Sequence, residues 1–510
     1  MHRKLWQPNL IVFVSSACIM IIELVAGRIM APYVGVSLYT WTSVIGVVLA
    51  GISLGNYLGG RIADRYASPR TLGIVFFVAS MASLSIVVLS EIVGNATTPP
   101  FLPLIVKITL LTSAIFFLPS CILGAVSPLV IKLTLKDLAQ TGGVVGKIYA
   151  YSALGSILGT FATGFFLISW FGTRTIAWGV GLILILMGLL FGDWRRAKGR
   201  AALMLGIFLG GSLFLLMNGW FRGPCFRETN YYCIKIRDKV LGDDSVVKVL
   251  ILDRLVHSYT SLDDPTRLVY GYEKIYAEAT EYAARRSSPL KTLFIGGGGY
   301  TFPRYIEAIY PGSSIEVVEI DPQVTRVAYE ELGLSPQTTI VTYNQDARIF
   351  FNDLEAERKY NLIIGDAFND YSVPYHLTTL GFNEEVKKHL QDDGLYVVNI
   401  VDGRHRLFLR AYLNTLRETF SHVYLVPVGE SWREDVRTTF VIMASQKELA
   451  TDEFAEIDGG DGERRIAKMI LTEQELDELL AEGRRVILTD DYAPVDNLLA
   501  PVFEESEARR

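Results

Sequence analysis

The sequence contains little charge and few cysteines for its length. Only 20% of its 510 residues are charged, whereas 50% are hydrophobic. So low a charged fraction, in a chain long enough for several domains, points toward a membrane protein. Acidic residues outnumber lysine and arginine, and the formal net charge of -6 leaves no basic footprint for nucleic acid. We therefore expect no nucleic-acid partner, and we predict no metal site.

The apolar residues are concentrated before about residue 220, and charged residues become dense after it. Seven stretches there are long enough, at roughly 20 residues each, to cross the hydrocarbon core as helices. The fourth contains Pro119 and Pro128, where it could be kinked. The first is no cleaved signal peptide, because it lacks a small-residue cleavage site and more spans follow it. The predicted spans are 9–30, 39–60, 71–93, 103–131, 146–170, 174–192 and 201–219.

Lysine and arginine in the loops predict the orientation of these spans. They gather before the first span and after the second, fourth and sixth, whereas the opposite loops hold essentially Arg174. Under the positive-inside rule the N-terminus is cytoplasmic, and seven spans then leave the C-terminal part outside. A ligand made in the cytosol would favour the other side, so the side stays open. The basic residues are Arg3, Lys4, Arg61, Arg65, Arg70, Lys132, Lys136, Lys147, Arg195, Arg196, Lys198 and Arg200.

The four cysteines divide between the two parts of the chain. Cys18 and Cys121 lie in predicted spans, and only Cys225 and Cys233 remain for the polar part. Their spacing of eight would allow a disulfide in an oxidising compartment, and two free thiols are the equal alternative.

Two charges, Glu23 and Arg28, fall inside the first span. Charges are costly in lipid, so each needs a partner or a water-filled cavity. Their spacing of five is long for a pair on one helix face, and we expect each to pair with another span. A functional role and a structural contact are equally compatible with this pattern.

The polar part reads as two units. Short β-rich runs between about 226 and 262 predict a small antiparallel sheet. From about 290 onward, apolar strands alternate regularly with amphipathic helices as far as residue 445. This alternation predicts an α/β fold with a parallel doubly wound sheet, which binds ligands at the carboxyl ends of its strands.

A glycine-rich stretch, "LFIGGGGYTF", follows the first of these strands. Gly296–Gly298 allow the backbone to turn tightly and approach a ligand. Glu319 ends the next strand, where a carboxylate can accept both hydroxyls of a ribose. Asp346, in "NQDAR", can accept from an adenine amine, and Asp366, in "IIGDAF", faces the same crevice. Helix caps and turn residues are the structural alternative for these carboxylates.

These residues resemble the spermidine synthase family, specifically its membrane-fused branch, over most of 226–445. Matching segments are "ETNYYCIKI", "LILDRLVHSYTSLDDPTRLVYGYEK", "IGGGGY", "VEIDP", "QDA" and "IIGDAFNDYSVPYHLTTLGF". The resemblance implies N-terminal strands packed on a methyltransferase-like core. It also implies decarboxylated S-adenosylmethionine or S-adenosylmethionine as co-substrate, with no further cofactor. Family members are commonly dimers, so a homodimer is expected.

The resemblance also assigns roles to residues. A sulfonium is a good leaving group, so transfer mainly needs a neutral amine held in line and a carboxylate that receives a proton. Asp366 falls on the family's catalytic aspartate, and Tyr231 on a tyrosine of the same pocket. Nucleoside-binding positions are Gly296, Gly297, Gly298, Glu319, Asp346, Ala347 and His257. Amine-binding positions are Tyr232, Tyr272, Glu273 and Asp370.

Several positions depart from the family pattern. Gly299 replaces the loop aspartate that would hold the aminopropyl ammonium of the donor. Tyr232 and His257 each replace a glutamine, and Tyr272 replaces a histidine or glutamine. Asp370 follows Asp366 by four residues instead of three. The residues expected to bind the nucleoside thus match the family pattern, whereas those expected to bind a diamine differ from it. His257 and Tyr272 equally fit packing roles.

We predict four segments: a seven-span transmembrane domain (1–220), a small β-rich unit (221–289), the methyltransferase-like nucleoside-binding core (290–449) and a helical, acidic C-terminal extension (450–510). The favoured function is a multi-pass cell-membrane aminopropyltransferase that acts on putrescine or a related small amine. Other sulfonium chemistry, either methyl transfer or a cyclase or lyase reaction, is a second reading. A non-catalytic nucleoside sensor or transporter is a third.

Overall fold

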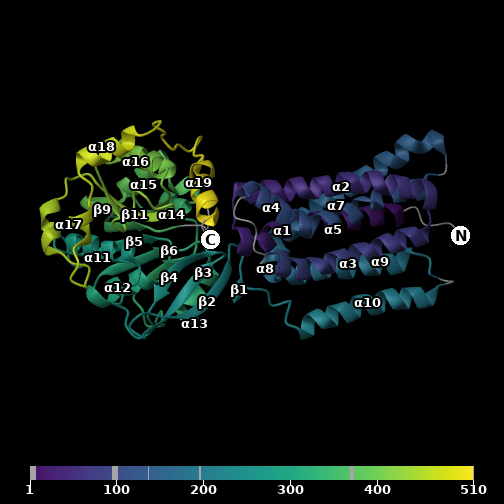
Figure 1. Ribbon diagram of the computed structural model, residues 1–510, viewed down its shortest axis with the longest axis horizontal. Coiled ribbons are helices and arrows are strands. Elements are labelled where there is room, and N and C mark those ends of the chain that lie inside the picture. The colour runs from purple at the N-terminus through teal and green to yellow at the C-terminus, as the bar shows by residue number, and fades with distance from the viewer. Residues whose placement is uncertain (1–6, 95–101, 136, 195–196, 368–372, 509–510) are drawn as a thin grey trace. The chain divides into compact units, whose positions relative to one another are not determined.

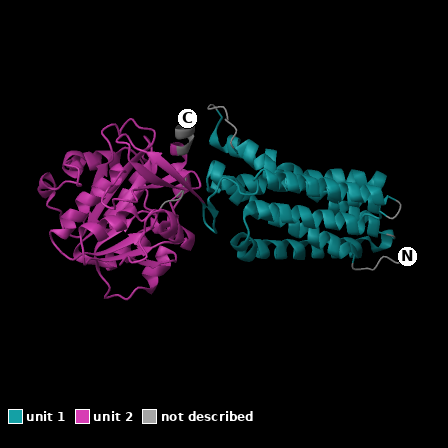
Figure 2. Ribbon diagram, turned by 90° about the horizontal axis from the view of Figure 1, so that it is seen from below, with its two compact units in different colours: residues 1–233 teal, residues 234–510 magenta. Residues whose placement is uncertain are grey.

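The computed structural model describes residues 7–94, 102–135, 137–194, 197–367 and 373–508, with side chains up to residue 502. The chain forms two compact units, Met1–Cys233 and Ile234–Arg510 (Figure 2).

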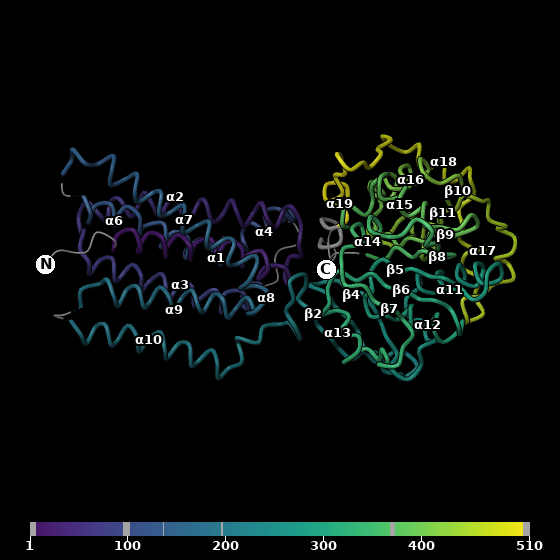
Figure 3. The backbone as a smooth tube through the Cα atoms, turned by 180° about the vertical axis from the view of Figure 1, so that it is seen from behind, coloured from purple at the N-terminus to yellow at the C-terminus, as the bar shows by residue number. Residues whose placement is uncertain are grey.

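Within its described residues, the first unit has seven helical spans long and apolar enough to cross a membrane, the predicted number and order. Figures 1 and 3 show these helices running side by side. The spans are Gln7–Val34 (α1), Leu38–Tyr66 (α2), Pro69–Gly94 (α3), Leu104–Thr134 (α4 to α6), Leu138–Trp170 (with α7, Thr141–Ala162, and α8, Ile168–Trp170), Thr173–Phe191 (α9) and Lys198–Met217 (α10).

The fourth span is continuous but irregular. It runs as α4 (Leu104–Thr112), a π-helical turn (Ser113–Phe117), α5 (Leu118–Gly124) and α6 (Val126–Thr134). Pro119, which follows the π turn, has no N–H for the helical ladder and its ring crowds the preceding turn, which explains the local widening. Pro128 lies in the first turn of α6, where proline is tolerated. The irregularity does not split the span, so the count stays at seven.

Glycines allow the backbones of these spans to approach closely. A Cβ at Gly155 of α7 would lie 2.0 Å from the carbonyl oxygen of Phe13 in α1. A Cβ at Gly55 of α2 would likewise lie 2.0 Å from the carbonyl oxygen of Cys121 in α5. These seams of small residues are the packing device that membrane helices use where lipid offers no hydrophobic drive.

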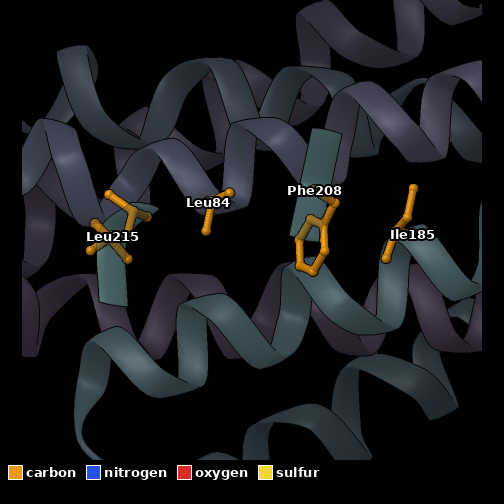
Figure 4. Packing of buried hydrophobic residues seen from close by; sticks show 5 residues of the cluster. Leu84, Ile185, Phe208 and Leu215 are labelled. Carbon is orange, nitrogen blue, oxygen red and sulfur yellow. The ribbon is translucent and has the colours of Figure 1, made fainter. Parts of the chain in front are cut away.

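The helices α3, α9 and α10 share a cluster of buried apolar side chains. It comprises Leu84, Val87, Ile185, Phe208 and Leu215 (Figure 4). Phe208 is fully buried and stacks on Trp178 at 6.5 Å between ring centroids. Packing contacts of this kind hold α10 in the unit.

Two charged side chains of the spans, Arg174 and Arg28, make hydrogen bonds within the unit. Arg174, at the start of α9, is 4% exposed and donates to Glu91 Oε2 at 2.6 Å. Arg28 donates to the backbone carbonyls of Thr229 (2.7 Å) and Tyr231. The expectation that Arg28 pairs with another span was therefore wrong, because carbonyls beyond the last span reach its guanidinium.

Cys225 and Cys233 are joined by a disulfide with an S–S distance of 2.04 Å, the first of the two alternatives above. The short strand β1 (Arg227–Glu228) lies between them. Glu228 accepts the N–H of Thr173 at 2.7 Å. It thereby satisfies one of the free donors at the N-terminus of α9.

The second unit begins with the predicted antiparallel sheet. It contains β2 (Cys233–Val240), β3 (Val246–Leu252) and β4 (Leu255–Thr260), paired in that order. A helix, α11 (Gly271–Ala284), follows within the segment assigned to the β-rich unit. Glu273 caps this helix, since its side chain accepts the N–H of Tyr270 at 3.3 Å.

A seven-stranded sheet with the order β10-β11-β9-β8-β5-β6-β7 forms the core of this unit. Its strands are β5 (Lys291–Ile295), β6 (Ser314–Val318), β7 (Val341–Tyr343), β8 (Tyr360–Gly365), β9 (Leu390–Asp402), β10 (His422–Pro427) and β11 (Thr438–Ser445). The strand order is methyltransferase-like, as expected. The sheet is mixed, however, because β11 is antiparallel to both neighbours. No helix stands between β10 and β11 to carry the chain back for a parallel strand.

Helices connect the parallel strands, and three of these helices have a side-chain cap at the N-terminus. Asp321, Asp346 and Thr379 each accept backbone N–H groups at such a start. The connecting helices are α12 (Thr301–Ile309), α13 (Pro322–Glu331), α14 (Ala347–Asp353), α15 (Leu380–Lys388) and α16 (Leu407–Thr419). The C-terminal helices are α17 (Arg465–Met469), α18 (Glu473–Ala481) and α19 (Val495–Ala508).

Candidate active site

Three segments of the second unit emerge together at one edge of the large sheet. Ile295, the last residue of β5, pairs with Val318 of β6 and with Gly365 of β8. Because these strands are parallel, the segments after them are neighbours at the carboxyl edge, where open α/β sheets bind ligands. The glycine loop and two of the predicted carboxylates occupy these segments.

The glycine loop is held between two of its predicted partners. Gly296 has a φ of 97°, and a Cβ there would lie 2.5 Å from the backbone oxygen of Asp366. Gly297 donates its N–H to Glu319 Oε2 at 2.8 Å. Gly298 also has a positive φ, of 48°. Such backbone angles and so close an approach favour glycine.

Gly299 packs directly against the small sheet. A Cβ at this position would lie 2.0 Å from Ser258 Oγ and 2.9 Å from Thr260 Oγ1, both on β4. An aspartate would therefore not fit here unless β4 moved. The packing of the loop against β4 thus explains why glycine stands at position 299, where the family pattern has aspartate.

Glu319 follows β6 and is 6% exposed. Its Oε1 accepts the N–H of Asp321 at 2.9 Å, and its Oε2 accepts that of Gly297. Burial raises its pKa above the ordinary glutamate value, against these hydrogen bonds. The N–H of Gly298 is a further donor to this carboxylate, which leaves one lone pair that can accept a ribose hydroxyl.

Asp346 follows β7 and caps the N-terminus of α14. Helix capping was the structural alternative to ligand binding for this carboxylate. Its Oδ1 accepts the N–H groups of Arg348 (2.8 Å) and Ile349 (3.2 Å). Its Oδ2 lies 2.8 Å from Nε2 of His376, a residue the sequence did not single out. Ala347 is the buried first residue of α14. The cap fixes the position of the Asp346 carboxylate but does not use both of its oxygens.

Asp366 lies at the centre of a buried polar cluster. Asn399 at the end of β9 donates from Nδ2 to Asp366 Oδ1 at 2.9 Å, and the hydroxyl of Tyr272 donates to the same carboxylate. Burial raises the pKa of Asp366 to about 6, although both hydrogen bonds favour its charged form. Oδ1 of Asn399 is buried and has no hydrogen-bond partner among the described residues. An acceptor is therefore available beside the carboxylate.

Glu273 is a second carboxyl of this region, buried at 3% exposure. Burial raises its pKa to about 8, and the negative charge of Asp366 acts in the same direction. Near neutral pH, Glu273 is therefore mostly protonated while Asp366 is mostly ionised. Such a separation of two pKa values is typical of sites where one group donates and another accepts a proton.

A cleft of about 350 Å³ opens onto Asp366. Its walls come from the β3–β4 turn, the start of α11, the end of β9 and the start of β11. The lining residues are Arg254, Leu255, Val256, His257, Tyr259, Tyr270, Tyr272, Asp366, Asn399, Val401, Arg437, Thr438 and Thr439. His257 and Tyr272 thus share a cleft with Asp366. Glu319 and Asp346 follow β6 and β7, two and three strands away from β8 in the sheet, and do not line this cleft.

The remaining predicted residues are not in this cluster. Tyr231 and Tyr232 belong to the first unit, in a turn where Thr229 Oγ1 accepts both of their N–H groups, at 3.0 and 2.8 Å. Asp370 lies outside the described residues. The second unit therefore assembles Asp366, Tyr272 and His257 on its own.

Asn399, Arg254 and Arg437 are cleft residues that the sequence analysis did not identify. Asn399 interrupts the apolar run "LYVVNIV" near a strand end. A polar residue in such a run is a sequence signal that could have indicated a functional residue. Arg254 and Arg437 lie in segments without a recognisable pattern, and only the fold brings them to the cleft. Among the described residues, no cluster of three or more potential ligands could hold a metal ion.

No family model matches the chain, but individual proteins do. A polyamine aminopropyltransferase of Vibrio vulnificus is 35% identical over 112 residues, which cover 22% of this chain and 38% of that protein. Over these residues the chain is similar to a polyamine aminopropyltransferase. A probable polyamine aminopropyl transferase of Bifidobacterium longum is 27% identical over 312 residues, covering 54% of this chain and 64% of that relative. The chain thus spans less than two thirds of either aminopropyltransferase.

Methyltransferases are similar as well. An eEF1A lysine and N-terminal methyltransferase of Xenopus laevis is 31% identical over 150 residues, covering 28% of this chain and 22% of that protein. Among solved structures, a probable spermidine synthase from Corynebacterium glutamicum aligns with a TM-score of 0.44 and 20% identity. It covers 51% of this chain and 95% of that structure.

Proposed function

We propose that this chain is a transferase that moves an aminopropyl group from decarboxylated S-adenosylmethionine to putrescine or a related amine. The observation that carries the proposal is the partly buried carboxylate of Asp366, held by Tyr272 and Asn399 at the wall of a cleft. The similarity to polyamine aminopropyltransferases supports this reaction type.

The chemistry needs positioning more than covalent help. The amine nitrogen attacks the carbon bound to the sulfonium, and the C–S bond breaks with its electron pair going to sulfur, which releases 5'-methylthioadenosine. The new ammonium then loses a proton to Asp366, whose pKa of about 6 leaves it ionised at neutral pH. The unpaired Oδ1 of Asn399 can accept an N–H of the same amine and fix its direction of attack.

The nucleoside half of the donor would bind along the neighbouring strand ends. Glu319 would accept a ribose hydroxyl, and the N–H groups and close approach of Gly296–Gly298 would line that part of the site. Oδ2 of Asp346 would accept the adenine amine in place of its contact with His376. The roles that the resemblance implies for Tyr231, Tyr232 and Asp370 in amine recognition stay predictions.

We further propose that residues 1–220 anchor the enzyme in a lipid bilayer and that the functional form is a homodimer. The seven apolar spans support the anchoring. Loop charges favour a C-terminal domain outside the cytoplasm. The disulfide between Cys225 and Cys233 is compatible with that side.

Methyl transfer from S-adenosylmethionine is the second candidate. The similarity to an eEF1A methyltransferase over 150 residues favours it. Product identity separates the two reactions, since methyl transfer leaves S-adenosylhomocysteine instead of 5'-methylthioadenosine.

The full chain, purified in detergent, should be incubated with each sulfonium donor, with and without putrescine, and the products identified by mass spectrometry. We expect 5'-methylthioadenosine and an aminopropylated amine in equal amounts. Asp366→Asn should abolish turnover while leaving affinity for 5'-methylthioadenosine within a few-fold, because the amide keeps the shape but cannot take the proton. Asp353→Asn, an exposed position on α14, is the matched control. Full activity of Asp366→Asn would refute the catalytic assignment.

A further inference from the structure

The C-terminal extension contacts the start of α14 through Asp490. The guanidinium of Arg348 donates from Nη1 to Asp490 Oδ1 at 2.7 Å and from Nη2 to Asp490 Oδ2 at 2.8 Å. Two parallel hydrogen bonds between charged groups fix the orientation of both partners. Arg348 also gives its backbone N–H to Oδ1 of Asp346, the carboxylate expected to bind the adenine amine. One residue of α14 is therefore bonded to both Asp346 and the extension.

The same arginine holds the segment between β8 and α15 that carries His376. Arg348 Nη1 donates to the backbone carbonyl of His376 and to Thr379 Oγ1, both at 3.0 Å. Thr379 caps α15 and gives its own hydroxyl hydrogen to Asp490 Oδ1 at 2.6 Å. Asp490 therefore bridges the start of α14 and the start of α15.

Backbone hydrogen bonds and close packing place Asp490 at this junction. Leu488, two residues earlier, is fully buried. Its carbonyl accepts the N–H of Leu380 at 2.8 Å, and its own N–H donates to Thr415 Oγ1 at 2.9 Å. A Cβ at Gly381 would lie 2.5 Å from Asp490 Oδ2. Although its side chain is half exposed, Asp490 thus has a defined position against α15.

These contacts allow the His376 ring to move while its backbone stays in place. Arg348 binds the carbonyl of His376 and not the imidazole, whose Nε2 lies 2.8 Å from Asp346 Oδ2. Rotation of the imidazole about its side-chain bonds would release Oδ2. Oδ1 would meanwhile keep the N–H groups of Arg348 and Ile349. An adenine amine could then replace the imidazole at a carboxylate that has not moved.

We infer that Asp490 is a positioning residue for adenine recognition. Through Arg348, it holds the carboxylate of Asp346 and the backbone of His376 in the geometry that accepts the exocyclic amine. The inference rests on the nucleoside site of the proposed function, and it adds a residue of the extension, residues 450–510, to that site. Because exposed ion pairs generally add little to folding stability, we expect this pair to act mainly on geometry.

Two nucleosides that differ in one group test the inference. 5'-Methylthioadenosine carries the exocyclic amine, whereas 5'-methylthioinosine has a carbonyl oxygen there, which a carboxylate would repel. Calorimetry on the full chain in detergent, at one pH, would give the ratio of the two affinities. We expect wild type to prefer the adenine nucleoside by about tenfold or more, as for a hydrogen bond to a charged group. Asp490→Asn weakens the hold on Arg348, so the ratio should fall by about threefold or more.

Three further variants separate positioning from folding. Asp491→Asn, at the next and exposed position, is the matched control and should leave the ratio unchanged. Arg348→Lys keeps the charge but loses the planar pair of donors, so it should lower the ratio as Asp490→Asn does. It also provides the test if thermal unfolding shows that Asp490→Asn does not fold. Asp346→Asn should lose the preference, and adding Asp490→Asn should then change the ratio no further, because Asp490 acts through Asp346.

An unchanged ratio in Asp490→Asn and Arg348→Lys would overturn the inference. An equal loss of affinity for both nucleosides would also overturn it, because a purely structural ion pair would give that result, and so would a further fall in the double variant. If wild type binds neither nucleoside, or both equally, Asp346 does not recognise adenine and the inference fails, even where aminopropylated product forms. The expected ratios without any such product would instead refute the proposed function and leave the inference standing.

Discussion

At the scale of single residues, Asp366 and Glu273 show how one environment sets two charge states. Glu273 is buried and Asp366 is partly buried, and desolvation raises both pKa values, that of Asp366 to about 6 and that of Glu273 to about 8. Hydrogen bonds from Asn399 and Tyr272 favour the charged form of Asp366 and so limit the rise of its pKa. The difference lets Asp366 accept a proton at neutral pH while Glu273 remains mostly neutral as the cap of α11.

The rate should therefore depend on the ionisation of Asp366. Because the pKa is raised to about 6, kcat/KM should fall as pH drops through that value and the carboxylate becomes protonated. Tyr272→Phe removes a hydrogen bond that favours the charged form, so the acid limb should move to higher pH. Comparing both proteins with one amine keeps the titration of the amine common to the two profiles. An acid limb that stays in place would contradict the role of Tyr272.

We expect Glu319 to contribute to the affinity for the nucleoside and not to the affinity for the amine. Glu319→Ala removes a charge-assisted hydrogen bond to ribose, so affinity for 5'-methylthioadenosine should fall by about 1.5 to 3 kcal/mol. Calorimetry measures this loss, with the exposed Glu357→Ala as control. Thermal unfolding of Glu319→Ala should be followed as well, because the side chain also holds Gly297. Unchanged affinity in a folded variant would remove Glu319 from the site.

At the scale of elements, the site depends on how the small sheet backs the glycine loop. Strand β4 presents Ser258 and Thr260 to Gly299, and Thr260 Oγ1 also lies 2.7 Å from Thr301 Oγ1 at the start of α12. The β3–β4 turn continues into the cleft wall at Arg254 and His257. One hairpin thus fixes the loop at one end and shapes the cleft at the other.

Gly299→Ala should disturb this contact. The added Cβ would meet Ser258 Oγ at 2.0 Å and Ser258 Cβ at 2.7 Å, an overpacking that should lower the free energy of unfolding by about 1 to 3 kcal/mol. Combining it with Ser258→Gly should restore part of the stability, measured by thermal unfolding in detergent. Gly242→Ala, where nothing lies within 4 Å of the added atom, should be nearly neutral. Equal stability of Gly299→Ala and wild type would show that β4 yields easily.

At the scale of the whole molecule, the chain joins an apolar seven-span unit to a polar α/β unit. Within the first unit, Arg28 holds the carbonyls of Thr229 and Tyr231, and a disulfide closes the segment that carries them. These hydrogen bonds give a structural reason for the charge of Arg28 in an apolar helix.

The side of the membrane can be tested by cysteine labelling in intact spheroplasts. Ala356→Cys reports on the C-terminal unit, and Ala67→Cys on the loop between α2 and α3; both positions are exposed. Given the loop charges, an impermeant reagent should label the first before lysis and the second only after it. Wild type gives the background from Cys18 and Cys121. The reverse pattern would place the C-terminal unit in the cytoplasm.

Local pattern alone determined much of this protein. Seven apolar runs, the alternation of strands and helices, and the carboxylates that end three strands could be read because each depends on residues near one another in sequence. The direction of β11 and the contact of Ser258 with Gly299 depended on packing between residues distant in sequence. Asn399, Arg254 and Arg437 meet Asp366 only because strands and turns distant in sequence share one edge of the sheet. Their chemistry comes from that proximity, which no local pattern encodes.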